Sequence, residues 1–327
     1  MKYQLEKYKG PHSRYTCPGC GHRREFVRYI DLDTGQHVAP GVGKCNREDN
    51  CGYHLTPGQY FRDQGRDIEC RIVPSRPPDI SVYSTITPSY CDRSYGLKSN
   101  FAQWLIAKFR SERVEAMADE YHLGYTRDGS VIFWQISITG EIRTGKVMQY
   151  DPATGRNTKR FNWVHSLLKD PQFVLKQCLD GEHLLAKHPD KPVLLVESYK
   201  NARVVRCLTD HYVCVSTDCK GGFTVERCRA LKGRNVMVLP DCGAYDDWKL
   251  KAEHIANKVG CRMIVSDFLE RIATPEQKER GYDIADWIID QIDDKVPLEC
   301  IADKLIEINP FYHPRIERII NSLIKRI

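Results

Sequence analysis

The sequence predicts an α/β protein in which a parallel sheet flanked by helices follows a basic α+β segment and a small cysteine-rich module. Three observations lead to this prediction. Two cysteine pairs lie near the N-terminus, within residues 17–51. Apolar and polar residues alternate over 130–150, which is typical of a hairpin. From residue 191 onward, short apolar runs alternate with helical patterns, as in parallel α/β sheets.

The composition indicates a globular protein with an anionic partner. The chain has 327 residues, 41% of them hydrophobic, and a formal net charge of +6. Positive charge favours nucleic acid, and no apolar run approaches the roughly 18–20 residues of a membrane span. The first residues lack the apolar stretch of a secretory signal, and 14 cysteines are typical of a reducing compartment. We therefore expect a cytoplasmic protein that does not contact membranes.

The N-terminal cysteines are spaced like metal ligands. They are Cys17, Cys20, Cys45 and Cys51. Two closely spaced thiolates can hold one metal ion, and a second pair completes a tetrahedron. Between the pairs we expect a hairpin, with one strand over 25–31 and a return strand beginning at His37. The sequence thus predicts a zinc ribbon over 1–69 with structural Zn²⁺, in which His22 or His54 stays open as a replacement for one thiolate.

A linker and a basic subdomain follow the ribbon. Residues 70–92 hold four prolines without a helical period, so we expect an extended linker. A basic α+β subdomain is expected over 93–188, with two short helices between 101 and 122 and a hairpin over 130–150. The remaining cysteines are scattered singly through apolar runs and are predicted to be small core residues.

The second strand of this hairpin leads into a basic run with aromatic neighbours. Positive side chains beside aromatic rings suit a phosphate backbone and stacked bases, although a solvated sheet face is the alternative. The cations that we expect to contact nucleic acid are Arg143, Lys146, Lys159 and Arg160. The stretch Gly140–Lys146 resembles a phosphate-binding P-loop, but Val147 stands where Ser or Thr is required. We therefore exclude a P-loop NTPase.

Residues 189–292 carry acidic residues at the ends of predicted strands. Glu197 and Asp241 each follow a buried strand, and the carboxyl ends of parallel strands meet at one edge of a sheet. Two carboxylates side by side can bind Mg²⁺ or Mn²⁺, which phosphoryl transfer needs. Further ligands are available in Asp246, Asp247, Asp283 and Asp286, each of which could instead cap a helix or lie at the surface.

The last segment, 293–327, predicts two helices, over 298–308 and 314–327. The second is basic and amphipathic, so it could dock a partner or DNA, or pack on its own domain. The sequence holds no helicase motor, so we expect a replicative helicase, where one is needed, to be a separate protein.

The order of these parts resembles bacterial and phage DNA primases, which combine a zinc ribbon, a basic subdomain and a Toprim domain. Val-Glu197-Ser-Tyr-Lys200-Asn201-Ala is similar to the Toprim Glu-Gly-x-x-Asp-Ala motif, Leu-Pro-Asp241 to the Asp-x-Asp motif, and Tyr-Asp283-Ile-Ala-Asp286-Trp to the late Asp-x-x-Asp motif. The segment 159–185 resembles a further primase stretch and adds Lys176 to the expected nucleic-acid contacts. The chain is similar to a zinc-ribbon plus Toprim-like family of Bacteroidetes genomes and mobile elements from about residue 15 to 290.

The resemblance implies a primase-like protein with metal-dependent nucleotidyl transfer on single-stranded DNA or RNA. Glu197 would be the general acid or base and Asp241 a metal ligand. Asn201 and Gly243, however, replace two acids of the Toprim motifs. Asp246 or Asp247 could compensate, or Lys200 could place a cation where a metal binds. Two alternatives therefore stay open: a degenerate DNA-binding accessory protein of a mobile element, and a Toprim nuclease.

Overall fold

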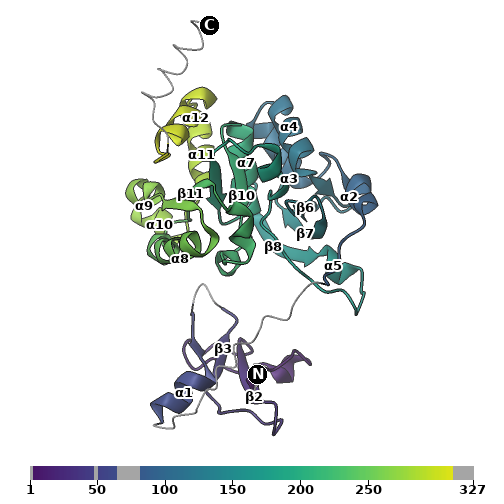
Figure 1. The fold of residues 1–327 in the computed structure, drawn as a ribbon, viewed down its shortest axis with the longest axis vertical. Coiled ribbons are helices and arrows are strands. Elements are labelled where there is room, and N and C mark those ends of the chain that lie inside the picture. The colour runs from purple at the N-terminus through teal and green to yellow at the C-terminus, as the bar shows by residue number, and fades with distance from the viewer. Residues whose placement is uncertain (1–2, 48–50, 65–81, 312–327) are drawn as a thin grey trace, which may run out of the picture. The chain divides into compact units, whose positions relative to one another are not determined.

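The computed structural model describes residues 3–47, 51–64 and 82–311. The chain divides into two compact units, Met1–Ile80 and Ser81–Ile327, and each is described here by itself (Figure 1). Most of the predicted linker and the predicted helix at 314–327 lie outside the described residues, and the predicted domain boundaries stay predictions. None of the helices in the described residues is long and apolar enough to cross a membrane.

The first unit is a small antiparallel sheet. Its elements are β1 (Tyr3–Leu5), η1 (Pro11–Ser13), β2 (Phe26–Asp31), β3 (Gly43–Cys45), β4 (His54–Leu55) and α1 (Pro57–Asp63), and the strands are paired in chain order. The prediction that a return strand begins at His37 is wrong, because His37 forms only an isolated bridge. The strand begins after Pro40, at Gly43, where a Cβ atom would meet the Val27 carbonyl oxygen at 2.1 Å.

The second unit begins with helices and a second antiparallel sheet. The elements are α2 (Pro88–Ser94), α3 (Asn100–Lys108), α4 (Ser111–Tyr121), β5 (Gly124–Tyr125), β6 (Val131–Ile136), β7 (Ile142–Tyr150) and β8 (Asn157–Trp163), with strand order β5-β6-β7-β8. The two predicted helices and the β6–β7 hairpin are confirmed. The last residues of the predicted linker are helical, because Pro88 starts α2, where a proline without N–H is tolerated. The strand β8 was not predicted.

The parallel sheet follows. Its segment comprises α5 (Val164–Leu167), α6 (His183–Lys187), β9 (Val193–Val196), α7 (Tyr199–Leu208), β10 (Val213–Ser216), η2 (Lys220–Gly222), η3 (Arg227–Leu231), β11 (Asn235–Leu239), α8 (Tyr245–Val259) and β12 (Arg262–Val265). The strands are ordered β10-β9-β11-β12 and all are parallel, as predicted. The unit continues with α9 (Phe268–Ile272), α10 (Pro275–Glu279), α11 (Ile284–Asp293) and α12 (Leu298–Glu307).

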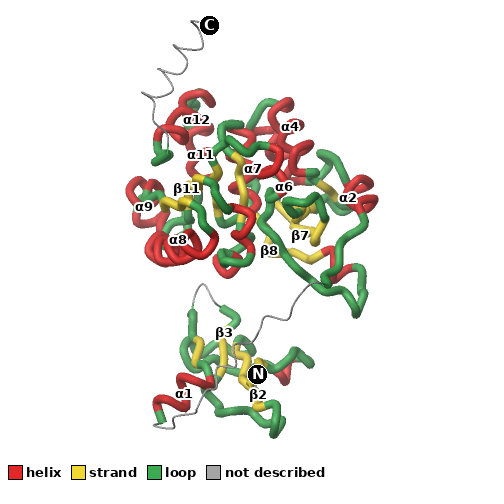
Figure 2. Tube along the Cα trace, in the orientation of Figure 1, coloured by secondary structure: helices red, strands yellow, loops and turns green. Residues whose placement is uncertain are grey.

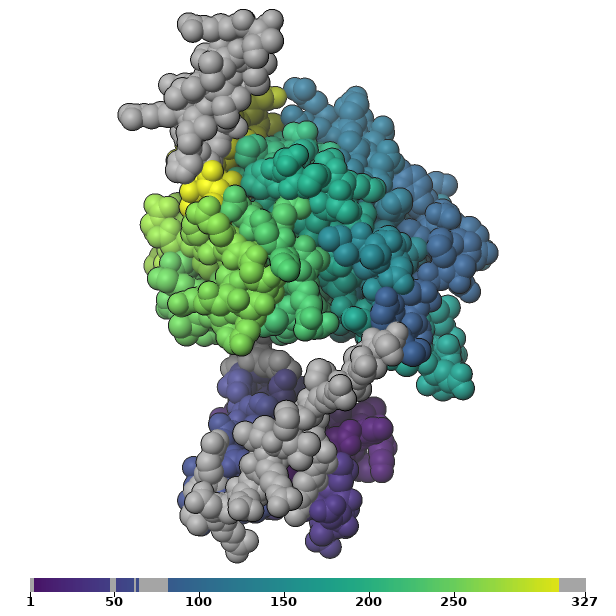
Figure 3. All heavy atoms as spheres, viewed as in Figure 1, coloured from purple at the N-terminus to yellow at the C-terminus, as the bar shows by residue number. Residues whose placement is uncertain are grey.

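Helices cover the parallel sheet, as Figure 2 shows in red and yellow. The helix α7 packs on β9 and β10 and contacts α4, α11 and α12, whereas α8 contacts β12 and η3. Because crossovers between parallel strands are right-handed, η3 and α8 lie on the face opposite α7. Figure 3 shows teal and green residues between the blue start and the yellow-green end of this unit. Most described cysteines outside the ribbon are buried as predicted, but Cys219 and Cys300 are exposed.

The two sheets of the second unit share one core. The ring of Phe133, from β6, stacks on Tyr199 of α7 with centroids 5.0 Å apart, and Gln135 Nε2 donates to the Tyr199 hydroxyl at 2.8 Å. Both aromatic side chains belong to the same buried cluster as β9 and β11. The antiparallel sheet is therefore fixed against α7, and through α7 against the parallel sheet.

Candidate functional site

The four predicted cysteines come together in the first unit. The Sγ atoms of Cys17 and Cys51 lie 3.7 Å apart and those of Cys20 and Cys45 4.0 Å apart. All four Sγ atoms lie within 4.8 Å of one another. This distance suits a tetrahedral zinc ion, whose Zn–S bonds are about 2.3 Å long. A backbone hydrogen bond from His22 lowers the pKa of the Cys20 thiol to about 6, which favours the thiolate that binds metal.

The two histidines left open as replacement ligands are engaged elsewhere. His54 Nε2 lies 2.9 Å from the hydroxyl of Tyr29, and the two rings stack. His22 Nδ1 lies 2.6 Å from Arg47 Nη1. The structure therefore supports the four thiols as the zinc ligands.

Four acidic residues surround the carboxyl ends of the parallel strands, and we call them the acidic edge: Glu197, Asp241, Asp283 and Asp286. Residue 197 directly follows β9, and Asp241 follows β11 by two residues; the two strands are neighbours, with Leu239 opposite Val196. Asp283 caps α11 by accepting the Asp286 N–H at 2.8 Å. Burial, followed by the charges of Asp283 and Glu197, raises the pKa of Asp241 well above its usual 3.8.

A lysine occupies the centre of the acidic edge. The Nζ atom of Lys200 lies 3.3 Å from Asp283 Oδ2 and 3.1 Å from Asp286 Oδ1. Burial opposes its charge, but these two carboxylates outweigh burial and raise the pKa of Lys200. Its neighbour Asn201 donates from Nδ2 to Asp241 Oδ1 at 3.1 Å. Both contacts arise because Ser198 caps α7 and accepts the N–H of Asn201, which fixes the first helical turn against the acids.

The acids fit a divalent ion poorly in this arrangement. A metal site needs at least three His, Cys, Asp or Glu side chains whose ligand atoms converge. Within 3–47, 51–64 and 82–311, the four cysteines are the only such group. Asp246 and Asp247 do not reach the acidic edge: both are exposed in the first turn of α8, and Asp247 pairs with Lys220 at 2.5 Å. Lys200 thus supplies the positive charge at the acidic edge.

A cavity of about 420 Å³ opens beside Lys200. It lies between Asp283 and Asp286 on one side and the turn from Thr154 to Asn157 on the other. The turn packs closely on the Trp104 ring at Gly155. A Cβ atom at this position would lie only 2.1 Å from the ring, so the contact requires glycine. The loop that leads into β8 therefore borders the acidic edge.

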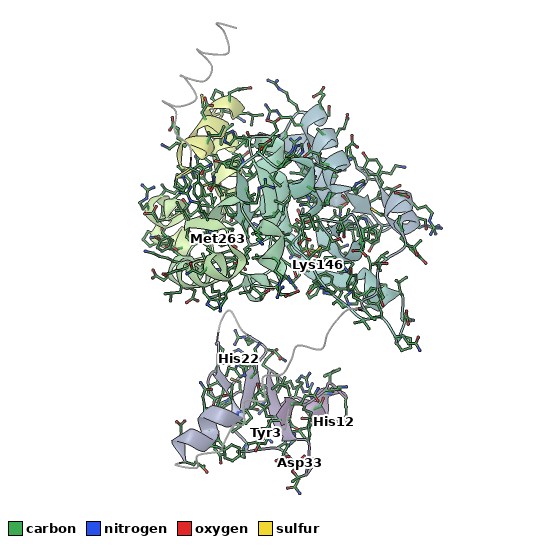
Figure 4. All side chains as sticks on the ribbon, in the orientation of Figure 1. Tyr3, His12, His22, Asp33, Lys146 and Met263 are labelled. Carbon is green, nitrogen blue, oxygen red and sulfur yellow. The ribbon has the colours of Figure 1, made fainter. Side chains whose placement is uncertain are left out.

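The predicted nucleic-acid contacts differ in their exposure to solvent. Lys159 and Arg160 are exposed on β8. Lys146 of β7, labelled in Figure 4, is largely buried and donates to Asp218 Oδ1 at 2.5 Å. Arg143 is also buried, against Glu141. Lys176 lies 5.0 Å from the centroid of the Tyr83 ring.

Sequence reasoning missed Asp218, whereas Phe161 and Trp163 belong to the aromatic neighbours that it assigned to the basic run. Asp218 follows the carboxyl end of β10, so the rule that singled out Glu197 could have found it. Phe161 is 59% exposed, and with Trp163 it lies near the Lys146 ammonium, whose Nζ is 5.0 and 5.4 Å from the two ring centroids. The ion pair of Lys146 with Asp218 therefore joins this aromatic face to the carboxyl ends of the parallel strands.

Two family models match the chain. A zinc beta-ribbon finger matches residues 1–66, and a domain of unknown function (DUF6371) matches residues 99–242. No curated protein matches the sequence significantly. The zinc-ribbon match and the converging thiols together support the predicted zinc site.

Among solved structures, the chain is similar to bacterial primases. The RNA polymerase domain of Mycobacterium tuberculosis primase DnaG shows 14% identity over 71% of this chain and 88% of that chain, with a TM-score of 0.38. A DnaG primase catalytic domain bound to ssDNA shows 10% identity over 73% and 96%, with a TM-score of 0.36. The zinc-binding and RNA polymerase domains of the Aquifex aeolicus primase show 12% identity over 90% and 93%, with a TM-score of 0.35. Likeness at this level carries no functional argument.

We expect the purified protein to hold one zinc ion per chain and Cys45→Ser to lose it. The reason is that three thiolates leave the tetrahedron incomplete, and structural zinc contributes about 10–16 kcal/mol to folding in zinc-finger peptides. Metal content by elemental analysis and chelator release with a colorimetric indicator measure this. The control is Cys219→Ser, which changes an exposed thiol outside the cluster. Full zinc content in Cys45→Ser would contradict the site.

We expect Asp241→Asn to raise the melting temperature at neutral pH by a few degrees, since about 1 kcal/mol shifts a domain of this size by roughly 2–4 °C. The raised pKa means that Asp241 keeps its proton to a higher pH in the folded state than in the unfolded chain, where its pKa is roughly 3.9. The wild-type protein therefore loses folding stability as the pH rises from the unfolded pKa of Asp241 through its folded pKa. The difference in melting temperature between Asp241→Asn and the wild type should grow across that pH range and then stay constant.

Thermal unfolding at a series of pH values measures this gap. Asp246→Asn, which removes an exposed acid from α8, is the matched control and should leave the profile unchanged. A destabilised Asp241→Asn at neutral pH would mean that the ionised carboxylate is favourable in the folded state.

Proposed function

We propose that this is a primase-like protein that binds single-stranded nucleic acid along β8, beside a Toprim-like sheet edge at which Lys200 pairs with two of the acids. The observation that carries the proposal is the exposure of β8: every residue from Asn157 to Asn162 is exposed, although the strand belongs to a sheet whose other strands are largely buried. An exposed strand with cations and a protruding aromatic ring suits a flexible anionic polymer.

The direction of the side chains supports this proposal. In the β7–β8 pairing, Lys146 lies opposite Trp163 and Met148 opposite Phe161, so these four side chains share one face. The same face reaches Asp218 through Lys146. Bases stacked on Phe161 and Trp163 would therefore lie next to the carboxyl ends of the parallel strands, and the exposed Lys159 and Arg160, which precede Phe161, would contact the backbone phosphates.

The acidic edge favours a binding role over metal-dependent chemistry. A divalent ion needs several carboxylate oxygens turned toward one point. Here Asp283 and Asp286 are turned toward Lys200, and Asp241 accepts the amide of Asn201. The ammonium supplies permanently the positive charge that an ion would bring.

Metal-dependent nucleotidyl transfer is the second candidate, and one observation favours it. Asp241 remains under repulsion from Asp283 and Glu197 even with Lys200 in place. Residual negative charge of this kind would be relieved by an added cation. A divalent ion held by Glu197 and Asp241 would supply charge stabilisation to a phosphoryl group.

We expect the substitutions on β8 to weaken binding of a fluorescent single-stranded DNA oligonucleotide in two distinguishable ways. Phe161→Ala should lower the affinity about 5- to 150-fold, because one stacked base is worth about 1–3 kcal/mol. The double variant Lys159→Ala/Arg160→Ala should reduce the slope of log affinity against log salt by about 1.4, because each phosphate contact on a single strand contributes about 0.7.

Exposed residues of α8 provide matched controls for this anisotropy measurement. Leu250→Ala removes a side chain that is 71% exposed, and Lys258→Ala removes an exposed cation. Neither should change affinity. Equal losses in the β8 and α8 variants would place binding elsewhere.

We expect no template-dependent products when the protein is incubated with single-stranded DNA, labelled nucleotides and Mg²⁺ or Mn²⁺, and we expect DNA affinity to be the same after chelation of these ions. The reason is that Lys200 already pairs with two of the acids, Asp283 and Asp286, that a divalent ion would need as ligands. Short products that disappear in both Glu197→Gln and Asp241→Asn would overturn the binding-only proposal in favour of nucleotidyl transfer.

A further inference from the structure

A second cavity, of about 460 Å³, lies between the β6–β7 hairpin, the segment before α6 and η3. Its lining is dominated by five cations: Arg143, Lys176, Arg227, Arg229 and Lys232. Only two acids line it, Glu182 and Glu226. The cavity shares no lining residue with the one beside Lys200. It is therefore a separate, positively charged site.

The two acids are already engaged. Glu226 Oε2 pairs with Arg229 Nε at 2.7 Å. The carboxylate of Glu182 accepts the backbone N–H groups of Ile138 at 2.9 Å and of Leu179 at 3.2 Å. The five cations outnumber these two carboxylates, so the lining keeps an excess of positive charge.

Arg143 is the most constrained of these cations. Its side chain is buried, its Nη2 pairs with Glu141 at 3.0 Å, and its guanidinium lies 3.7 Å from the centroid of the Tyr83 ring. Its buried Nη1 has no hydrogen-bond partner. Buried N–H groups of a charged side chain are rarely left unpaired, because the lost hydration is costly. Because Arg143 lines the cavity, an anion that entered there and reached Nη1 would supply the missing acceptor.

Two further cations of the cavity, Lys176 and Arg227, are held in place by contacts of their own. Lys176 lies over the same Tyr83 ring, with Nζ 5.0 Å from its centroid. Arg227 donates to the carbonyl oxygen of Thr217 at 2.9 Å and to Gln177 Oε1, both neutral acceptors that leave its charge uncompensated. Fixed cations of this kind bind an anion without first having to be ordered.

We infer that this cavity binds the phosphate groups of a nucleotide or of a nucleic-acid 5′ end. Guanidinium groups match phosphate oxygens in pairs, and a volume of this size lies within the roughly 300–1,000 Å³ of small-molecule sites. The site goes beyond binding along β8, because none of the residues proposed there lines it.

Isothermal titration calorimetry with inorganic tripolyphosphate tests the inference on the full chain. We expect saturable binding to the wild type and at least 10-fold weaker binding to Lys232→Glu and to Lys176→Ala. Lys232 is exposed, so its replacement should leave the fold intact, and an unchanged melting temperature checks this. Lys258→Glu, the same charge change on an exposed residue of α8, is the matched control and should bind like the wild type.

Two results would overturn the inference: no binding to the wild type, or equal weakening in Lys232→Glu and Lys258→Glu, which would indicate diffuse attraction only. Phe161→Ala should leave tripolyphosphate binding unchanged, which separates this site from β8 even where DNA binding fails. Oligonucleotides with and without a 5′ phosphate distinguish the two sources. A preference for the phosphorylated strand that Lys232→Glu abolishes identifies a nucleic-acid end, and equal affinity for both strands identifies a free nucleotide.

Discussion

The buried ion pair between Arg203 and Asp180 is the constraint on which the second unit depends. Both side chains are 0% exposed, and the guanidinium donates to the two carboxylate oxygens at 2.6 and 2.7 Å. Asp180 also accepts the hydroxyl of Ser216 at the end of β10, and the ring of Tyr121 from α4 lies 3.7 Å from the guanidinium. Two charges taken out of water are costly unless they pair, and here they pair through two hydrogen bonds, although Arg203 Nε has no hydrogen-bond partner. The pair therefore ties α7, β10, α4 and the chain before α6 into one arrangement.

This arrangement decides the chemistry of the acidic edge. Arg203 lies one turn after Lys200 on α7, so the register that pairs Arg203 with Asp180 also directs Lys200 and Asn201 at the carboxyl ends of β9 and β11. The lysine meets Asp283 and Asp286, and the amide meets Asp241. Lys200 and Asn201 are thus held in place by the core of the fold. An internal cation of this kind cannot leave, whereas a metal ion exchanges with solvent.

The positive charge of the chain is not spread evenly over the second unit. One part lies on β8, where the cations are exposed beside Phe161, and another is gathered around the cavity of Arg143, where they are fixed by Tyr83, Thr217 and Gln177. Exposed, flexible cations suit a polymer whose position varies along its length, and fixed cations suit a compact group of defined shape. Lys146 belongs to neither group, because Asp218 and three aromatic rings surround its ammonium.

Local patterns were enough to predict the four converging cysteines, the alternation that builds the parallel sheet and the placement of Glu197 and Asp241, because cysteine spacing and strand periodicity are local properties of the chain. They also indicated the β6–β7 hairpin, but not β8, whose exposed residues carry no apolar alternation. Long-range packing, by contrast, separates the paired cations from the exposed ones. Lys146 and Lys200 are alike in sequence to Lys159 and Arg160, yet the first two meet Asp218 and Asp283 across the fold. Pairing between residues far apart in the chain depends on packing, and no local pattern encodes it.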